Sequence, residues 1–449
     1  MNNITNTTSN INKEQILSLC HQSLEAVQKH LSILTSVATS IAAPGGPIEP
    51  KRLVEHQYAL HGYAWMATYI TALREFYNWA ERLNNKGLLD DLEILILQCG
   101  FGSYLKQLRY GIAMSQDEFA RPFDLGIVDA TELSTPEIDE LIFRGDTINV
   151  RQNIAKILSE RIGTRSFGNL SLDDTHTIIR DQFSRFSDER VAPEAQAWHI
   201  ADELIPMEII MEMSDLGVFG LTLPEENGGL GLDKTAMCIV TEELSRGYIG
   251  VGSLSTRSEI AAELIRFNGT NEQKERYLAP IASGSILPTA VFTEPNHGSD
   301  LAHIRTRAKY VKNIYKITGN KIWITHGARS DLMTLLARTN TENNGYGGLS
   351  MFLAEKPRGT DEVPFPAKGM SGSEIRVLGY RGMKEYEIAF DSYEINENSL
   401  LGGEEGNGFK QLMSSFETAR IQTAARAIGV AQNALELSLN YANVRSQFN

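Results

Sequence analysis

The chain has 449 residues, a length that corresponds to about three domains. It carries 42 Lys and Arg residues against 56 Asp and Glu residues. The resulting formal net charge of −14 argues against nucleic acid as a main partner, because phosphate binding favours a basic surface. Hydrophobic residues make up 42% of the chain and charged residues 22%, which excludes a mostly disordered protein.

The sequence has no pattern typical of a membrane, secreted or metal-bound protein. No apolar run comes near the roughly 20 residues that a membrane-spanning helix needs. The N-terminus lacks the basic and apolar segments of a secretion signal. The cysteines Cys20, Cys99 and Cys238 are far apart and odd in number, which disfavours a disulfide framework and a Cys-based zinc site. We therefore expect a cytoplasmic protein without a bound metal.

Helical periodicity runs from Lys13 to about Ile157. Residues 56–83 and 88–108 repeat apolar residues at helical spacing, which predicts a helical bundle. A polar stretch follows, and we assign residues 1–168 to this N-terminal helical extension. We interpret the aromatic residues of the bundle as parts of its core rather than as a ligand cage: Tyr63, Trp65, Tyr69, Phe76, Tyr77 and Trp79.

Residues 169–286 are predicted to form a second helical domain. A helix from residue 175 is expected to end before Ala192-Pro193, because a proline disfavours the helical conformation of the residue that precedes it. Three further helices are predicted at residues 206–217, 233–250 and 256–269, and each is closed by a glycine.

From about Leu287 the apolar period changes to that of strands, so we assign residues 287–402 to a β-domain. The runs IYKIT and KIWIT around Gly319-Asn320 predict a hairpin. From residue 403 the helical period returns and stops at residue 449 without a capping signal. We therefore expect a C-terminally truncated fragment that holds only the start of a C-terminal helical domain. The predicted fold class is α+β with several domains.

The loop FTEPNHGSD, residues 292–300, is the most informative stretch for function. Thr293, Ser299 and the backbone N–H groups of this loop can bind a heteroaromatic edge or a pyrophosphate. A structural turn with polar caps would use the same residues. In the next motif, KIWIT, Trp323 and Thr325 are expected on one strand face, because residues two apart point the same way. Together they suit a planar ring with polar atoms, and the alternative is an ordinary cross-strand aromatic.

Two groups of residues on the last predicted helix can be interpreted either as ligand-binding residues or as ordinary surface residues. Glu417 and Arg420 are three residues apart and can pair on one helical face, either at a ligand or in solvent. Arg445, Gln447 and Phe448 combine a cation with an aromatic ring, which can hold a nucleotide or can simply be an exposed end.

Taken in order, these motifs resemble the acyl-CoA dehydrogenase family over about residues 173–449. The resemblance implies a helical domain, a β-barrel-like middle domain and a C-terminal four-helix domain. It also implies FAD as cofactor, oxidation of an acyl-CoA thioester to a 2-enoyl-CoA, and an electron-transfer flavoprotein as electron acceptor. The preceding bundle is absent from ordinary members and resembles the extension of a member that acts on a methyl-branched dicarboxylate thioester. The motifs that carry the resemblance are LGVFGLTLPEENGGLG, FTEPNHGSD, YKITGNKIWIT, GYRGMKEYEIAFD, LLGGEEGNGFK, RIQTAARAIGVAQ and YANVRSQF.

The resemblance also assigns roles to individual residues. Phe292 and Thr293 would meet the flavin ring, with the Thr293 hydroxyl near flavin N5. Ser299 would contact the FAD pyrophosphate and the pantetheine arm of CoA. Trp323, Ile324 and Thr325 would line the flavin ring, Arg420 and Glu417 would lie near CoA, and Arg445, Gln447 and Phe448 would reach the FAD of a neighbouring subunit, which implies a homo-oligomer.

The catalytic base of the family is a Glu, either in the C-terminal domain or on this long helix directly before the Arg. Here Ala419 precedes Arg420, so the helix location has no carboxylate. We therefore expect the base beyond Asn449, and we expect residues 1–449 alone to be inactive.

A second carboxylate on the acyl chain would need a cationic partner when it is buried. Arg257, beside Ser258 at the start of a predicted helix, is our candidate, and a surface arginine is the alternative. Two other functions stay open. One is a dehydrogenase for short or branched monocarboxylic acyl-CoA, and the other is a non-catalytic flavin- or CoA-binding fragment.

Overall fold

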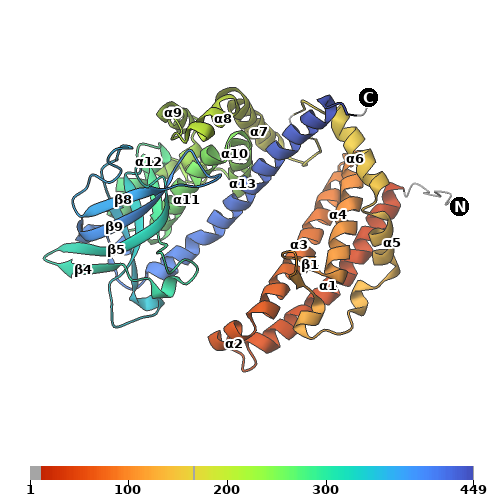
Figure 1. The fold of residues 1–449 in the computed structure, drawn as a ribbon, viewed down its shortest axis with the longest axis horizontal. Helices are drawn as coiled ribbons and strands as arrows, with labels where there is room; N and C mark the ends of the chain where they lie inside the picture. The colour runs from red at the N-terminus through yellow and green to blue at the C-terminus, as the bar shows by residue number, and fades with distance from the viewer. Residues whose placement is uncertain (1–11, 165–166, 448–449) are drawn as a thin grey trace, which may run out of the picture. The chain divides into compact units, whose positions relative to one another are not determined.

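The computed structural model describes residues 12–164 and 167–447. The chain divides into two compact units (Figure 1). The first consists of residues 1–172 together with residues 439–449, and the second of residues 173–438.

The first unit is the helical bundle that the periodicity predicted. Its long helices bury one apolar core between them. Asn12 begins the first helix with a capping box, in which its side chain accepts from Gln15 N at 2.8 Å. Five of the six aromatic residues pack against the core as predicted, whereas Trp65 is exposed and donates to His61. The elements are α1 (Lys13–Ala42), α2 (Pro50–Glu55), α3 (Gln57–Asn85), α4 (Asp91–Tyr110), α5 (Pro136–Arg144), α6 (Ile148–Glu160) and the short strands β1 (Ile112–Ala113) and β2 (Phe119–Ala120).

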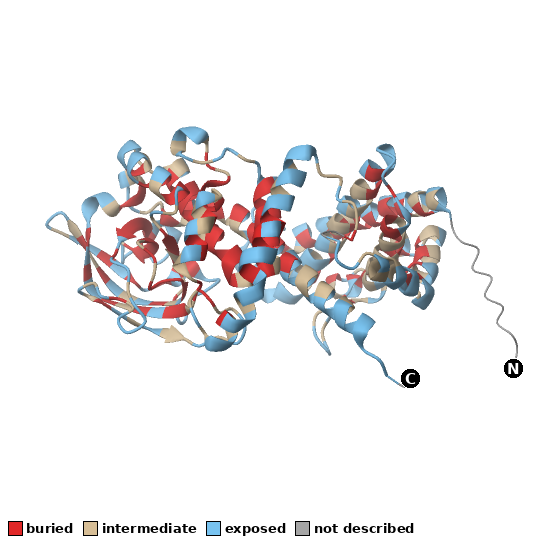
Figure 2. Ribbon diagram, turned by 90° about the horizontal axis from the view of Figure 1, so that it is seen from above, coloured by how far each residue is buried: buried red, intermediate tan, exposed pale blue. Residues whose placement is uncertain are grey.

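The second unit begins with helices that surround α11, which is buried along almost its whole length (Figure 2). The predicted helix end before Ala192-Pro193 is wrong. A π-helical turn at Ser187–Val191 joins two helices, and Pro193 lies in the first turn of the second, where its missing N–H costs nothing. The helices are α7 (Asp174–Phe186), α8 (Ala192–Ala201), α9 (Met207–Asp215), α10 (Lys234–Gly247), α11 (Ile249–Asn268) and α12 (Asn271–Ala282).

The β-domain is a curled, seven-stranded sheet with the order β3-β6-β4-β5-β9-β8, in which β7 pairs with β6. Helices α11 and α12 share an apolar core with β3, β6 and β7 (Figure 1). The strands are β3 (Pro288–Val291), β4 (Arg307–Val311), β5 (Ile314–Thr325), β6 (Leu332–Arg338), β7 (Leu349–Glu355), β8 (Met370–Ile375) and β9 (Glu385–Asn396).

The predicted hairpin at Gly319-Asn320 is wrong, because β5 runs through these residues as one strand paired with β9. Gly319 is needed for close approach rather than for a turn. A Cβ at this position would lie 2.6 Å from Thr306 Cα, and the backbone φ is +151°.

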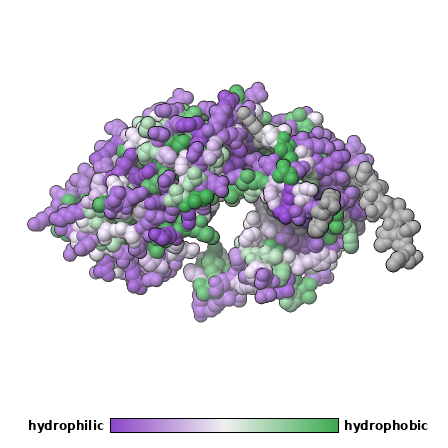
Figure 3. Space-filling model, turned by 45° about the horizontal axis from the view of Figure 1, so that its top comes forward, coloured by the Kyte–Doolittle hydropathy of each residue, from purple (hydrophilic) through white to green (hydrophobic). Residues whose placement is uncertain are grey.

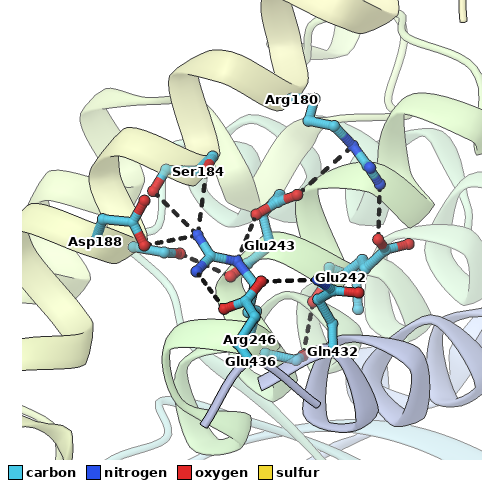
Figure 4. A network of polar contacts seen from close by, with 11 residues as sticks. Arg180, Ser184, Asp188, Glu242, Glu243, Arg246, Gln432 and Glu436 are labelled. Carbon is cyan, nitrogen blue, oxygen red and sulfur yellow. Dashed lines mark hydrogen bonds and ion pairs between the residues drawn. The ribbon is translucent and has the colours of Figure 1, made fainter. Parts of the chain in front are cut away.

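The last helix, α13 (Gly408–Val444), packs on α10 in the second unit. Ion pairs join α10 to α7, to the turn Ser187–Val191 and to α13 (Figure 4). Arg246 Nη2 lies 2.8 Å from Asp188, and Arg246 Nη1 lies 3.6 Å from Glu436. Burial raises the pKa of Glu243, which pairs with Arg246 at 3.0 Å.

Hydrophilic residues cover most of the face shown in Figure 3, and hydrophobic residues form small groups on it. None of the helices in the described parts of the chain combines the length and the apolarity needed to cross a bilayer.

Candidate functional site

The FTEPNHGSD loop is fixed to β5 by a buried ion pair. Lys321 Nζ lies 3.1 Å from Glu294 Oε1 and donates to Phe292 O at 2.8 Å. Glu294 also accepts the backbone N–H groups of Arg305 at 2.6 Å and Thr306 at 2.8 Å. Burial lowers the pKa of Lys321 to about 8. Burial alone would raise the pKa of Glu294, but the Lys321 charge and these N–H donors hold it below its usual value.

This anchoring brings the two predicted flavin motifs together. Ile322 N donates to Thr293 O at 3.0 Å, so the residue before Trp323 is hydrogen-bonded to the loop. Thr293 is half-buried, and Ser299 is exposed farther along the loop. Phe292 is buried, with its ring 6.2 Å from that of Phe416 on α13.

Trp323 and Thr325 do not share one environment, which corrects the prediction from strand alternation. The β5–β9 register shifts between Lys321 and Ile324, and Trp323 has a backbone φ of +60°. This bulge interrupts the alternation on which the prediction depended. Trp323 is 53% exposed, whereas Ile324 and Thr325 are buried.

Arg257 contacts the buried end of this motif. Its Nη2 donates to Thr325 Oγ1 at 2.7 Å, and its Nη1 donates to Ser253 Oγ at 3.0 Å. The residue is half-buried, so the alternative of a surface arginine is wrong. It lies in the middle of α11, since this helix begins at Ile249 and not at the predicted residue 256.

A second arginine, Arg426 of α13, meets Arg257 at the same hydroxyl. Its Nη1 donates to Ser253 Oγ at 2.6 Å and to the Tyr380 hydroxyl at 2.9 Å. Ser253 and Tyr380 are also hydrogen-bonded to each other. Burial lowers the pKa of Arg426, and its buried Nε has no hydrogen-bond partner among the residues that the structure describes. Within residues 12–164 and 167–447, neither guanidinium forms an ion pair with an acid. Arg257 and Arg426 thus concentrate positive charge at one place.

Glu417 and Arg420 do not pair in the described part of the chain, which corrects a second expectation. Both side chains are exposed, and the Arg420 guanidinium lies 5.8 Å from the centre of the Phe416 ring. The cation therefore stacks on the aromatic residue one turn earlier. Phe416 also meets Phe292, so two ring contacts connect Arg420 to the FTEPNHGSD loop.

The C-terminal group belongs to the first unit, and its predicted role toward FAD stays a prediction. The Arg445 guanidinium lies 5.4 Å from the Tyr441 ring centre. Gln447 Nε2 donates to Ser446 O at 2.9 Å. Phe448 lies outside the described residues.

The sequence interpretation missed Arg426, Tyr380 and Ser253. These residues come from three separate segments of the chain and converge only in the fold. The one local signal for Arg426 is that a cation lies in a stretch of small residues, AARAIG, on a helix that must pack against other helices. The loop and β5 residues fit a flavin, because an exposed Trp ring, a hydroxyl and fixed backbone groups lie together.

Comparisons with known proteins identify the family. Family models match the "Acyl-CoA dehydrogenase, N-terminal domain" at residues 173–285, the middle domain at 289–393 and the C-terminal domain at 406–449. The chain is 54% identical to the (2S)-methylsuccinyl-CoA dehydrogenase of Cereibacter sphaeroides over 96% of this chain and 79% of that protein. This match must include most of the N-terminal bundle.

Solved structures of two related enzymes are similar to part of this chain. Butyryl-CoA dehydrogenase from Megasphaera elsdenii is 28% identical with a TM-score of 0.57, covering 63% of this chain and 72% of that chain. A glutaryl-CoA dehydrogenase from Mycobacterium smegmatis in complex with FADH2 is also 28% identical, with a TM-score of 0.55, covering 62% and 68%.

Proposed function

This chain belongs to the acyl-CoA dehydrogenase family, and we propose that it oxidises (2S)-methylsuccinyl-CoA to mesaconyl-CoA. The thioester loses a proton from its α-carbon and a hydride from its β-carbon, and a double bond forms between them. FAD, the cofactor of this family, accepts the hydride when it is bound. The protein must hold the CoA and acyl parts of the substrate and orient the reacting carbons.

The observation that carries the proposal is the pair Arg257 and Arg426, which share Ser253 Oγ without an acid between them. Arginine stays protonated in proteins, so two positive charges lie together. Such a pair is costly unless an anion compensates it. Methylsuccinyl-CoA carries one free carboxylate at the end of its acyl chain, and this group matches the pair.

Hydrogen-bond directions supply a third donor. Ser253 Oγ accepts from both guanidiniums, which uses both of its lone pairs, so its own proton goes to Tyr380. The Tyr380 oxygen then accepts from Ser253 and Arg426. The Tyr380 proton has no acceptor among the residues that the structure describes, so it can be donated to the substrate carboxylate.

The remaining assignments are part of the same proposal. Ser299, Glu417 and Arg420 bind the CoA portion. The catalytic base is proposed to lie outside the turn of α13 that precedes Arg420, because Ala419 has no proton acceptor. Its expected place beyond Asn449 stays a prediction. FAD is held by Phe292, Thr293, Ser299, Trp323, Ile324 and Thr325, and by Arg445, Gln447 and Phe448 of a neighbouring subunit.

The partners follow from the reaction. The electrons must leave the reduced cofactor, and we assign them to an electron-transfer flavoprotein. We also propose a homo-oligomer, because Arg445 and its neighbours are assigned to the FAD of another subunit. The cytoplasm is the proposed compartment.

A substrate panel on the FAD-loaded full-length protein, which includes the base expected beyond Asn449, tests the proposal with an artificial electron acceptor. We expect methylsuccinyl-CoA to be oxidised with a kcat/KM at least tenfold above those of butyryl-CoA and isobutyryl-CoA, the order of one buried charge-assisted contact. Arg426→Met should remove this preference. The control Arg276→Met removes a 61% exposed cation and should keep it. Equal rates for all three thioesters would instead favour a monocarboxylic acyl-CoA dehydrogenase.

A further inference from the structure

Glu385 is a buried acid next to the arginine pair, and neither the family motifs nor the proposed reaction assigns it a role. It is the first residue of β9 and is 5% exposed. Its Oε1 accepts the Thr325 hydroxyl at 2.7 Å, and its Oε2 has no partner in the described part of the chain. A buried carboxylate with one free oxygen is costly, so its retention needs a reason.

The direction of the hydrogen bonds connects Glu385 to Arg257. An arginine only donates, so Thr325 Oγ1 must accept from Arg257 Nη2. The single Thr325 proton is therefore free to go to Glu385. Glu385 and Arg257 are thus separated by one hydroxyl group. Burial raises the pKa of Glu385, and the Thr325 hydrogen bond and the Arg257 charge oppose this rise.

The formal charges of Arg257, Arg426 and Glu385 can now be added. Arg257 and Arg426 contribute two positive charges, and an ionised Glu385 contributes one negative charge from behind Thr325. One positive charge is left for the acyl chain. A single carboxylate on the substrate completes neutrality, whereas a dianion would leave an excess negative charge in a buried place.

We propose that Glu385 is a specificity-determining residue that sets the net charge of the arginine pair to match one carboxylate on the acyl chain. This inference rests on the proposed function. Glu385 does not touch the carboxylate itself. It reduces the attraction of the pair for any anion and so restricts binding to a monoanion.

Two inert CoA thioethers test the proposal on the FAD-loaded protein. S-(3-carboxypropyl)-CoA and S-butyl-CoA have the same chain length and differ in a terminal carboxylate or methyl group. Neither can be dehydrogenated, because they lack the thioester carbonyl. Calorimetry or the visible flavin spectrum gives both Kd values, and the readout is the ratio of the butyl Kd to the carboxypropyl Kd.

Glu385→Gln keeps an oxygen that accepts from Thr325 and removes only the charge. We expect it to raise the ratio by about tenfold, because a repulsive charge one hydroxyl group away from Arg257 is lost. Glu387→Gln, an exposed position on the same strand, is the matched control and should leave the ratio unchanged. A ratio above one in the parent protein with no rise in Glu385→Gln would overturn this inference alone. A ratio near one in the parent protein would overturn the proposed function.

A measurement on the unmodified protein keeps the proposal open to refutation if Glu385→Gln does not fold. The phosphonate of S-(3-phosphonopropyl)-CoA loses its second proton near pH 8, so at pH 9 it is mainly a dianion, and both thioethers are compared at that pH. We expect the phosphonate to bind more weakly than S-(3-carboxypropyl)-CoA. Equal or tighter binding of the dianion would contradict a pocket matched to one charge.

Discussion

Lys321 and Glu294 form a fully buried ion pair that holds the FTEPNHGSD loop against β5. Lys321 is 0% exposed and donates to Phe292 O in the loop, and Glu294 accepts the backbone N–H of Thr306, just before β4. A buried pair contributes little net stability compared with apolar residues, but removing one partner leaves an uncompensated charge. The pair therefore specifies the position of the loop more than it stabilises the fold.

We expect Lys321→Met to lower the free energy of unfolding of the second unit by about 3–5 kcal/mol, because Glu294 is left buried and unpaired. Lys321→Met combined with Glu294→Gln should recover part of this loss, because no buried charge remains, while the single amide oxygen of the introduced glutamine accepts only one of the N–H groups of Arg305 and Thr306. Urea unfolding of the single and double variants measures both values. If the double variant is as unstable as the single one, the uncompensated charge is not the cause.

Trp323 gives an optical test of the flavin position. The side chain is 53% exposed beside the loop, so a bound flavin ring would cover it and quench its fluorescence. We expect FAD to quench the tryptophan emission of the parent protein and Trp323→Phe to remove most of that change. Trp198→Phe, at a buried position beside Tyr248, serves as the control and should keep the quenching. Strong quenching in Trp323→Phe would place the flavin elsewhere.

The motifs were enough to predict the family and to propose a flavin role for the FTEPNHGSD loop, because each motif is recognised from neighbouring residues alone. The sequence did not distinguish the two uses of Gly319. A Gly-Asn pair suits a hairpin turn, but it also suits a strand that approaches the Thr306 backbone, and only the partner strand decides between them. Arg426 and Tyr380 could not be paired in advance, because 46 residues separate them and no local spacing relates them.

The position of His176 predicts a pH-dependent contact between the N-termini of two helices, α7 and α10. Its ring contacts Asp173 at 2.9 Å and Asp233 at 3.0 Å, and these residues cap α7 and α10. The hydrogen bond to Asp233, and then that to Asp173, raise the pKa of His176 above its usual 6.5. A base with a raised pKa in the folded state stabilises that state below the unfolded pKa, and this contribution is lost as pH rises through the folded value.

We therefore expect His176→Gln to speed amide hydrogen exchange in the first turns of α7 and α10 at pH 6, relative to the parent protein. At pH 9 the two proteins should exchange at similar rates, because the imidazole is then neutral in both states. Salt should weaken the difference at pH 6, since both aspartates are exposed. An equal difference at both pH values would show that the charge of His176 does not matter.

The surroundings of Gly429 indicate that α13 packs closely on α10. A Cβ at this position would overlap the Glu242 carbonyl oxygen and lie 3.0 Å from Arg246 N. Alanine normally favours a helix interior over glycine by about 1 kcal/mol. Here the neighbours are backbone atoms that cannot move aside, so an overpacking cost of about 1–3 kcal/mol should outweigh the propensity. We expect Gly429→Ala to destabilise the second unit and to loosen the pair between Arg246 and Glu436.

Gly62→Ala provides the matched comparison on α3, where the new Cβ would lie 3.5 Å from Ala120 Cβ, an ordinary packing distance. With no backbone in the way, helix propensity should dominate, and the first unit should be unchanged or stabilised by up to about 1 kcal/mol. Opposite signs for the two substitutions in denaturant unfolding of the respective units would support the close α10–α13 contact. A stabilising Gly429→Ala would mean that α13 is free to move away from α10, and the position of Arg426 beside Arg257 would then not be fixed by helix packing.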